Sequence, residues 1–243
     1  MPYVNQFFPE TRFGGFTHVD GTMNFFTRVN ALLEPGSVVL DVGCGRGEYA
    51  DDPVRVRRDL RVLRGKCRTV IGIDVDPASR VNPVIDEFLL LEGPKWPVAG
   101  DSVDLCLCDH VIEHVADPDA FFAECRRVIR PNGFLCIRTP NTFGYVAIAA
   151  RLVPNTLHSK VLRVAQRGRE ERDVFPTVYK CNTRLKLCNI LARNHFDSAV
   201  FTYDAEPSYL SFSKLAYYLG VAHQRYAVPG AKNAIFAFAQ KRS

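Results

Sequence analysis

Two carboxylates placed at or near the ends of short apolar runs are the strongest chemical signal in this chain of 243 residues. The first run, Val38–Val42, contains Asp41 and leads into three glycines at alternate positions. Glycines so spaced let a backbone turn tightly and approach a ligand closely. The second run ends at Asp74, where a carboxylate can accept hydrogen bonds from both hydroxyls of a ribose. The pattern predicts a nucleoside-containing cofactor, with a helix-capping or turn aspartate at position 74 as the alternative.

The spacing of the glycines argues against a dinucleotide. Dinucleotide-binding loops read GxGxxG, whereas here Gly47 falls one place early and Glu48 stands where the third glycine is expected. The chain also lacks a YxxxK pair. A nucleotide-dependent oxidoreductase or epimerase is therefore retained only as an alternative.

A third group of polar residues follows the predicted strand Val103–Asp109. The strand passes into the segment 110–115, His-Val-Ile-Glu-His-Val, and then into a helix whose apolar residues recur at helical spacing. A Pro-Asn-Gly sequence ends that helix, and a further strand is predicted over 134–140. Together with the glycine loop, this series resembles the class I S-adenosylmethionine-dependent methyltransferases, of the type 11 and type 23 groups.

The resemblance implies S-adenosylmethionine as the cofactor. Asp41 and the loop backbone would hold its methionine end, Asp74 would bind its ribose, and Glu92 stands where the family places a contact to the adenine amino group. The full cofactor-binding set that the resemblance implies is Asp41, Gly43, Cys44, Gly45, Asp74, Val75, Glu92, Asp109 and His110.

Strand and helix patterns alternate along the whole chain, which indicates an α/β fold. After residue 182 we expect a helix over Thr183–Asn194, a strand over Ala199–Tyr203, a helix over Phe212–Leu219 and a strand over Ala234–Ala239. The resemblance implies a Rossmann-like sheet of seven strands, with helices on both faces and the last strand antiparallel, as one domain over residues 1–243. The cofactor is then expected at the carboxyl ends of the first strands, where the strand order reverses.

Three histidines are candidates for a catalytic base. A base is needed if the methyl acceptor is a hydroxyl group, such as that of a sugar, because a hydroxyl is a weak nucleophile at neutral pH. His110 follows the fourth strand. His18 belongs to an N-terminal cap, residues 1–35, whose helix lies over the sulfonium end of the cofactor in the resembled family. His158 belongs to the segment 141–182, which has no counterpart in a minimal sheet of this family and is expected to form a lid over the acceptor. An aspartate is the alternative base, and an ordinary loop residue is the alternative role for His18.

The segment 51–68 between the glycine loop and the second strand is strongly basic. It could bind phosphate groups of a substrate, but a solvated helix face explains it without any ligand, and we favour that interpretation.

The amino-acid composition indicates the broad class of protein. With 47% hydrophobic residues and 31 basic against 26 acidic side chains, the chain fits one globular domain and does not require a nucleic acid or an anionic membrane as partner. The beginning of the sequence has neither a basic start nor a long apolar stretch, so we expect a cytoplasmic protein without a membrane span.

The eight cysteines fall mostly inside predicted strands and helices, which suits free thiols in a reducing compartment. No CxxC pair supplies zinc-ligand spacing, and we expect no metal. Cys44, in the glycine loop, is expected to be exposed enough to react, with a small residue beside the cofactor as the alternative.

The absence of certain sequence motifs narrows the chemical class of the methyl acceptor. No DPPY or NPPY sequence is present, and Thr139-Pro140-Asn141 after the fifth strand lacks a cysteine, so a nucleic acid is not expected as the acceptor. Three segments, Gly-Gly-Phe-Thr-His, Arg-Thr-Pro-Asn-Thr and Phe-Pro-x-x-Tyr-x-x-Asn-Thr, resemble bacterial methyltransferases associated with glycan synthesis. They imply O-methylation of a saccharide or a small hydroxylated metabolite by direct in-line transfer. A non-catalytic methyltransferase-like partner subunit is the other alternative, and the sequence leaves the oligomeric state open.

Overall fold

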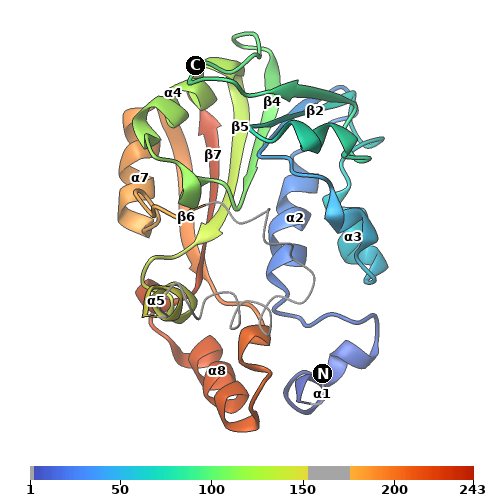
Figure 1. Cartoon of the computed structure of the whole chain (residues 1–243), viewed down its shortest axis with the longest axis vertical. Coiled ribbons are helices and arrows are strands. Elements are labelled where there is room, and N and C mark those ends of the chain that lie inside the picture. The colour runs from blue at the N-terminus through green and yellow to red at the C-terminus, as the bar shows by residue number, and fades with distance from the viewer. Residues whose placement is uncertain (1–2, 153–175) are drawn as a thin grey trace.

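A computed structural model shows one seven-stranded sheet with helices on both of its faces (Figure 1). The structure describes residues 3–152 and 176–243. The strands are β1 (Val38–Val42), β2 (Thr69–Asp74), β3 (Glu87–Leu90), β4 (Val103–Asp109), β5 (Ile129–Pro140), β6 (Phe196–Tyr203) and β7 (Ala234–Lys241). Their order in the sheet is β3-β2-β1-β4-β5-β7-β6, and β7 runs antiparallel to both of its neighbours. The predicted Rossmann-like sheet with an antiparallel last strand is confirmed.

The helices that cover the sheet begin at polar caps. Asp20 accepts a hydrogen bond from the Met23 amide at the start of α2, and Asp117, Thr183 and Ser213 cap α4, α7 and α8 in the same way. The α-helices are α1 (Val4–Phe7), α2 (Gly21–Ala31), α3 (Arg55–Arg61), α4 (Pro118–Val128), α5 (Tyr145–Leu152), α7 (Arg184–Arg193) and α8 (Lys214–Tyr226). Short 3-10 turns lie at Pro9–Arg12, Glu48–Asp51, Pro77–Val81, Ile112–His114, Ser208–Leu210 and Pro229–Ala231.

The two faces of the sheet form two separate cores, because successive side chains of a strand point to opposite faces. In β1, Leu40 and Val42 belong to the core under α4 and α7, while Val39 belongs to the core under α2. Figure 1 shows α4 and α7 on one side of the sheet and α2 and α3 on the other. Asp41 shares the α2 face with Val39, so its carboxylate is placed in a largely apolar layer.

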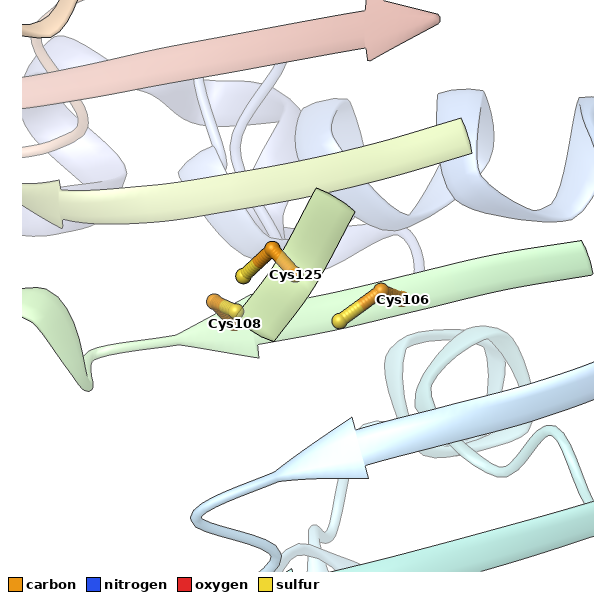
Figure 2. Close-up of side chains that lie close together, drawn as sticks. All are labelled: Cys106, Cys108 and Cys125. Carbon is orange, nitrogen blue, oxygen red and sulfur yellow. The ribbon is translucent and has the colours of Figure 1, made fainter. Parts of the chain in front are cut away.

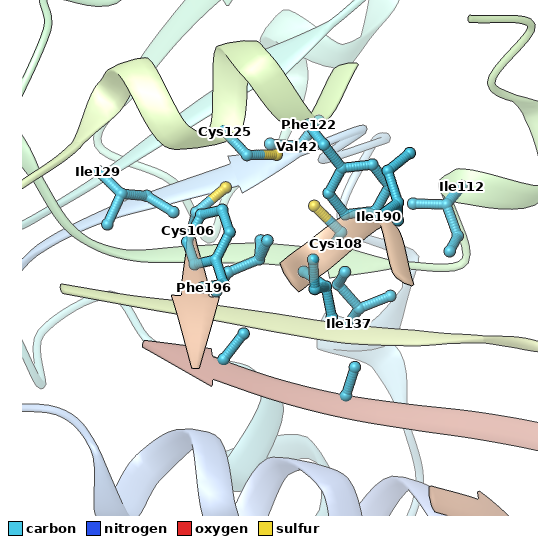
Figure 3. Close-up of a cluster of buried hydrophobic side chains, with 14 of the residues drawn as sticks. Val42, Cys106, Cys108, Ile112, Phe122, Cys125, Ile129, Ile137, Ile190 and Phe196 are labelled. Atoms are coloured by element: carbon cyan, nitrogen blue, oxygen red, sulfur yellow. The ribbon is translucent and has the colours of Figure 1, made fainter. Parts of the chain in front are cut away.

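Three cysteines meet in the core under α4. Cys106 and Cys108, two residues apart on β4, face Cys125 of α4 (Figure 2). Apolar side chains that include Phe122 and Ile137 surround them (Figure 3). Residues two apart on a strand share one face, so Cys106 and Cys108 point the same way, and α4 adds the third cysteine.

Element boundaries depart from the sequence expectations at several places. The helix α4 ends at Val128 rather than at the Pro-Asn-Gly turn, because Ile129 already pairs with Val103 of β4. Helix α3 covers only seven residues of the basic segment. Helix α8 continues to Tyr226. None of the described helices has the length and apolar character needed to cross a bilayer.

Candidate active site

A cavity of about 1020 Å³ opens at the carboxyl ends of β1, β2 and β4. This is the sheet edge at which the sequence placed the cofactor, between β1 and β4 where the strand order reverses. Of the nine residues expected to bind the cofactor, eight line this cavity: Asp41, Gly43, Cys44, Gly45, Asp74, Val75, Asp109 and His110.

The glycine loop forms the floor of the cavity, and two of its residues require glycine. Gly43 has a φ of 66° and Gly45 a φ of 55°, a region that side chains with a Cβ rarely adopt. A Cβ on Gly43 would also lie 2.8 Å from Val111 Cγ2. Asn82 holds the loop from below, since its Nδ2 donates to the carbonyl oxygens of Cys44 at 2.9 Å and Gly45 at 3.1 Å.

Three amides of this loop already have acceptors within the chain. The Gly43 and Cys44 amides donate to the Ile73 carbonyl at 2.7 and 3.3 Å, and the Gly45 amide donates to Asp74 Oδ2 at 2.9 Å. In loops that bind a pyrophosphate, the backbone amides point at the ligand. These three amides are therefore not presented to a phosphate.

Asp41 lies between the loop and the α2 face of the sheet and is 7% exposed. Burial, together with the negative charge of Asp109, raises the pKa of the Asp41 carboxyl to about 8. Within the described part of the chain, no group donates a hydrogen bond to this carboxyl. A positively charged ligand at this position would favour the ionised carboxylate.

Asp109, by contrast, accepts hydrogen bonds on both carboxylate oxygens from a buried arginine. Asp109 and Arg138 are register partners on β4 and β5, and Nε and Nη2 of Arg138 donate to the two carboxylate oxygens at 2.6 and 2.7 Å. Burial acts to raise the pKa of Asp109, but attraction to Arg138 outweighs it and holds the pKa well below its ordinary range. Arg61 of α3 adds a second positive charge, with its Nη2 3.6 Å from Asp109 Oδ2. Asp109 therefore shapes the cavity wall as an ionised, paired group.

The cavity is acidic as a whole. Among the described residues that line it are seven carboxylates and three arginines, with no lysine. An excess of carboxylates favours a cationic ligand and disfavours a polyanionic one. The seven are Asp41, Glu48, Asp51, Asp52, Asp74, Asp76 and Asp109.

His110 stands at the edge of the cavity in a constrained position. Its φ is 60°, an uncommon value for a residue with a side chain, and such values are concentrated at functional sites. Its Nδ1 lies 3.2 Å from Glu113 Oε1, while the imidazole remains 45% exposed. Of the three histidines proposed as the base, the structure places His110 in the cavity.

Glu113 is the buried partner that orients His110. It is 3% exposed, and its other oxygen accepts a hydrogen bond from Thr139 Oγ1 at 3.0 Å, which in turn accepts one from Asn182 Nδ2 at 2.6 Å. Burial acts to raise the pKa of Glu113, but the hydrogen bond with His110 outweighs it, so the pKa lies below its ordinary value. Glu113 is thus a carboxylate that accepts from Nδ1–H of His110 and leaves Nε2 free of that proton.

The described end of the expected lid reaches the cavity beside this pair. Pro176 and Val178 line the cavity. The Val178 amide donates to the Glu113 carbonyl at 2.8 Å, and His114 Nδ1 lies 3.0 Å from the Pro176 carbonyl oxygen. His114 therefore holds the backbone at Pro176 against the cavity wall. The lid itself stays a prediction, and His158 lies outside the described residues.

Two of the expected site residues lie elsewhere. His18 lines a separate hollow of about 210 Å³, because Glu10 accepts from its backbone amide at 3.1 Å and holds its ring at 2.7 Å. Glu92 is exposed, and its neighbour Leu91 lines the cavity instead. Since successive residues of an extended chain face opposite ways, Leu91 in the cavity leaves Glu92 on the solvent side.

Cys44 is buried rather than exposed, at 4%. Burial, reinforced by the charges of Asp41 and Asp74, raises the pKa of the Cys44 thiol well above its ordinary value. The expectation of a reactive thiol was wrong, since it took a loop position as a sign of exposure. Cys44 is a small residue at the floor of the site that packs on Gly72.

The basic segment is more than a solvated face. Arg57 and Arg61, one helical turn apart on α3, both line the cavity. Arg57 donates to Asp52 and Asp20, and the Arg61 guanidinium lies 4.3 Å from the centre of the Tyr49 ring. The four-residue spacing was visible in the sequence, but nothing there distinguished these two arginines from their neighbours.

The cysteine cluster is the one group among the described residues with spacing suited to a metal, because all three sulfur atoms lie within 4.8 Å of one another. Cys106, Cys108 and Cys125 are each 0% exposed. Burial raises the pKa of Cys108 and Cys125 well above the ordinary value. Burial also acts to raise the pKa of Cys106, but the hydrogen bonds with the other two thiols outweigh it and lower the pKa to about 5. Buried cysteines in an apolar layer pack as small hydrophobic side chains, and the expectation of no metal stays a prediction.

Comparison with known proteins agrees with this geometry. Residues 40–137, from β1 to β5, match the family model described as "Methyltransferase domain". This part of the chain is similar to methyltransferase domains. The match begins one residue before Asp41 and ends one residue before Arg138, so the matched region holds the glycine loop and the His110–Glu113 pair.

Curated relatives match about half of the chain. A probable S-adenosylmethionine-dependent methyltransferase of Mycolicibacterium smegmatis is 32% identical over 139 residues, which are 54% of this chain and 48% of that protein. A ubiquinone biosynthesis O-methyltransferase of Mesorhizobium japonicum is 31% identical over 122 residues, 49% of this chain and 48% of that protein. The chain therefore spans about half the length of the curated relatives it matches.

Solved structures extend the likeness in fold to the whole chain. The S-adenosylmethionine-dependent methyltransferase from Archaeoglobus fulgidus superposes with a TM-score of 0.56 at 16% identity, over 96% of this chain and 97% of that one. At this identity the comparison establishes the fold and nothing finer. The seven-stranded sheet, β6 and β7 included, is the sheet of this fold.

Proposed function

We propose that this chain is an S-adenosylmethionine-dependent methyltransferase that methylates a hydroxyl group of a small acceptor. The observation that carries the proposal is the acidic cavity beside a glycine loop whose first amides are already hydrogen-bonded within the chain. A sulfonium compound with a charged amine suits such a site, whereas the pyrophosphate of NAD would meet carboxylates and three loop amides that already have acceptors.

The residues that would hold the cofactor fit its chemistry. Asp41 faces the cavity without a donor from the described chain, so it can accept from a charged amine. Asp74 is 8% exposed at the end of β2 and keeps lone pairs for ribose hydroxyls besides those it gives to the Gly45 and Asp76 amides. When bound, S-adenosylmethionine supplies an activated methyl group that needs only an aligned nucleophile.

The cavity leaves space for an acceptor. Its volume of about 1020 Å³ lies at the upper end of the range of roughly 300–1,000 Å³ that single ligands usually occupy. Besides the residues expected to hold the cofactor, the cavity is lined by Pro176, Val178 and Phe121, which are apolar, and by His114. An acceptor bound there would lie within the reach of His110.

His110 is the proposed general base. Because Glu113 holds Nδ1, the other ring nitrogen, Nε2, which lies 4.0 Å from Asp109 Oδ1, can take the proton of an acceptor hydroxyl as its oxygen attacks the methyl group. Glu113 fixes the ring orientation and stabilises the imidazolium that forms. The role assigned here to Glu113 is to position and stabilise, not to contact the acceptor.

The acceptor is proposed as a hydroxyl compound, in one of two chemical classes. The segments quoted above favour a saccharide or a small hydroxylated metabolite. The names of several relatives, ubiquinone biosynthesis O-methyltransferases, favour a hydroxylated ring compound. Both classes need the same base.

The experiment is methyl transfer from labelled S-adenosylmethionine to panels of phenolic and saccharide acceptors by the wild-type chain and two variants. We expect His110→Gln to lower kcat by about 10²- to 10⁴-fold and Glu113→Gln to lower it by about tenfold or more, with cofactor affinity kept. Glu124→Gln is the matched control, since Glu124 pairs with Arg127 on α4 outside the cavity lining.

Full activity of His110→Gln on an accepted substrate would exclude His110 as the base. Tight cofactor binding without transfer to any acceptor of either panel would instead favour a non-catalytic partner subunit. Methylation of RNA or protein alone would overturn the hydroxylated small-molecule acceptor.

A further inference from the structure

Helix α8 is apolar on two opposite faces. Tyr217 and Val221 are buried on one face, at 0% and 3% exposure, where they pack with Phe8. On the opposite face Leu215, Leu219 and Tyr226 are 69%, 59% and 82% exposed. At 100° per residue these three positions and residues 218 and 222 fall in one stripe along the helix.

The stripe continues beyond both ends of the helix. Phe212 before it and Val228 after it are each 69% exposed, and Tyr218 within it is 57% exposed. Single exposed apolar side chains are ordinary, but a contiguous apolar stripe marks an interaction surface. We call this surface the outer face of α8, and it comprises Phe212, Leu215, Tyr218, Leu219, Tyr226 and Val228.

The charged side chains of the stretch that carries the outer face of α8 have one sign. Residues 207–233 contain no aspartate or glutamate, while they contain two lysines, an arginine and a histidine. Lys214 and Arg225 are exposed, and the helical spacing puts both along one edge of the stripe. The carboxylate that comes just before this stretch, Glu206, accepts a hydrogen bond from the Tyr217 hydroxyl on the buried face.

We propose that the outer face of α8 docks this protein onto an anionic lipid surface. Aromatic and leucine side chains enter the headgroup boundary, and long basic side chains beside them reach lipid phosphates. A second copy of the chain is a poorer occupant, because two such faces would bring Lys214 and Arg225 of each copy together with no carboxylate on either stretch to pair them.

Helix α8 lies near the edge of the sheet at which the cavity opens. The Tyr145 ring of α5 contacts His223 of α8 at 5.0 Å, and α5 follows directly after the carboxyl end of β5 (Figure 1). The cavity opens at the carboxyl ends of neighbouring strands, so α8 and the cavity share one edge of the sheet. If the proposed function holds, docking brings the methyl-transfer site close to acceptors held at the lipid surface.

The experiment is flotation of the full chain with vesicles of phosphatidylcholine alone and of equal parts phosphatidylcholine and phosphatidylglycerol. We expect binding to the anionic vesicles that weakens in high salt. The double variant Leu215→Ser with Leu219→Ser should lower the affinity about tenfold or more. Lys214→Gln with Arg225→Gln should remove most of the salt dependence. Leu185→Ser is the matched control, because Leu185 is 71% exposed on α7, outside the outer face of α8.

Absence of flotation with the anionic vesicles would overturn the proposal, as would flotation of the double serine variant at the wild-type level. A wild-type dimer that the double serine variant converts to a monomer would assign the face to a second copy and would also overturn it. S-adenosylhomocysteine binding by each variant, measured in parallel, reports folding. A chain that floats but does not bind S-adenosylhomocysteine separates failure of the proposed function from failure of the docking.

Discussion

At the scale of single residues, the buried carboxylates of the site differ in how they are paired. Asp109 is matched by Arg138 in the strand register, and Asp41 has no donor from the described residues. The unpaired carboxylate stays protonated in the free protein up to about pH 8, whereas the paired one stays ionised. A cationic ligand would supply the missing partner, and this is the physical basis of the cofactor assignment.

Cofactor binding should consequently depend on pH. Because the pKa of Asp41 is raised to about 8, the free protein must lose a proton on binding a cation below that pH. We expect affinity for S-adenosylmethionine to rise with pH up to about 8 and then level off, with proton release in titrations run in buffers of different ionisation enthalpy.

Asp41→Asn is the control for that pH dependence. It should weaken binding by about 1 to 3 kcal/mol and abolish the linked proton release. The same raised pKa means that Asp41 contributes stability to the unliganded protein below its unfolded pKa of 3.8 and loses that contribution as pH rises through about 8. An unchanged pH profile in the asparagine variant would remove Asp41 from the site.

The Asp109–Arg138 pair should matter for stability. Both side chains are buried, and Arg138 Nη1 also donates to Thr22 Oγ1 of α2 at 2.8 Å. Arg138→Met leaves Asp109 without its main partner and should cost about 3 to 5 kcal/mol of unfolding free energy in urea titrations. Arg138→Met combined with Asp109→Leu should recover much of that loss. A loss below about 1 kcal/mol in the single variant would contradict this account of the pair.

At the scale of elements, the glycine loop is held by a residue outside the cavity lining. Asn82 donates to two loop carbonyls, and its Oδ1 accepts from the Val84 amide at 3.0 Å. Asn82→Ala leaves buried carbonyls without donors and frees the loop, so we expect S-adenosylhomocysteine affinity to fall about tenfold in calorimetric titration. Asn194→Ala, which removes a single bond to the Ile190 carbonyl on α7, should leave affinity unchanged. Equal affinities in the two variants would contradict the supporting role of Asn82.

The strands and the cofactor-binding edge were predictable from sequence because both depend on local patterns. Apolar runs ending in Asp41-Val42 and Asp74 mark the strands, and the glycines mark the turn. The pairing of Asp109 with Arg138 was not predictable, since it depends on the register between β4 and β5. The same holds for the role of Glu113, whose partners Thr139 and Asn182 come from distant parts of the chain.

Where the structure places a side chain differently from the expectation, the cause is that sequence position does not report the direction of a side chain. Cys44 lies in a loop but faces inward, and Glu92 follows the residue that enters the cavity. His18 is near in sequence to the helix over the site but is held by Glu10. The arginines of α3 are identical in residue type, and only their packing distinguishes those that line the cavity from those that face solvent.

At the scale of the whole molecule, the cavity and the outer face of α8 lie at one edge of a single sheet. The match to known methyltransferase domains ends at residue 137, so β6, β7 and α8 are shared with solved structures in fold alone. The sequence patterns identified the cofactor more readily than the acceptor, because the cofactor site is built from short motifs and the acceptor side from segments without one.

Calorimetric titration of the purified chain with S-adenosylhomocysteine and, separately, with NADH tests which cofactor the cavity binds. The expected result is micromolar binding of S-adenosylhomocysteine, weakened in the Asp41→Asn variant, and no detectable binding of NADH. Binding of NADH with no binding of S-adenosylhomocysteine would contradict the account and would restore the nucleotide-dependent oxidoreductase as the better interpretation.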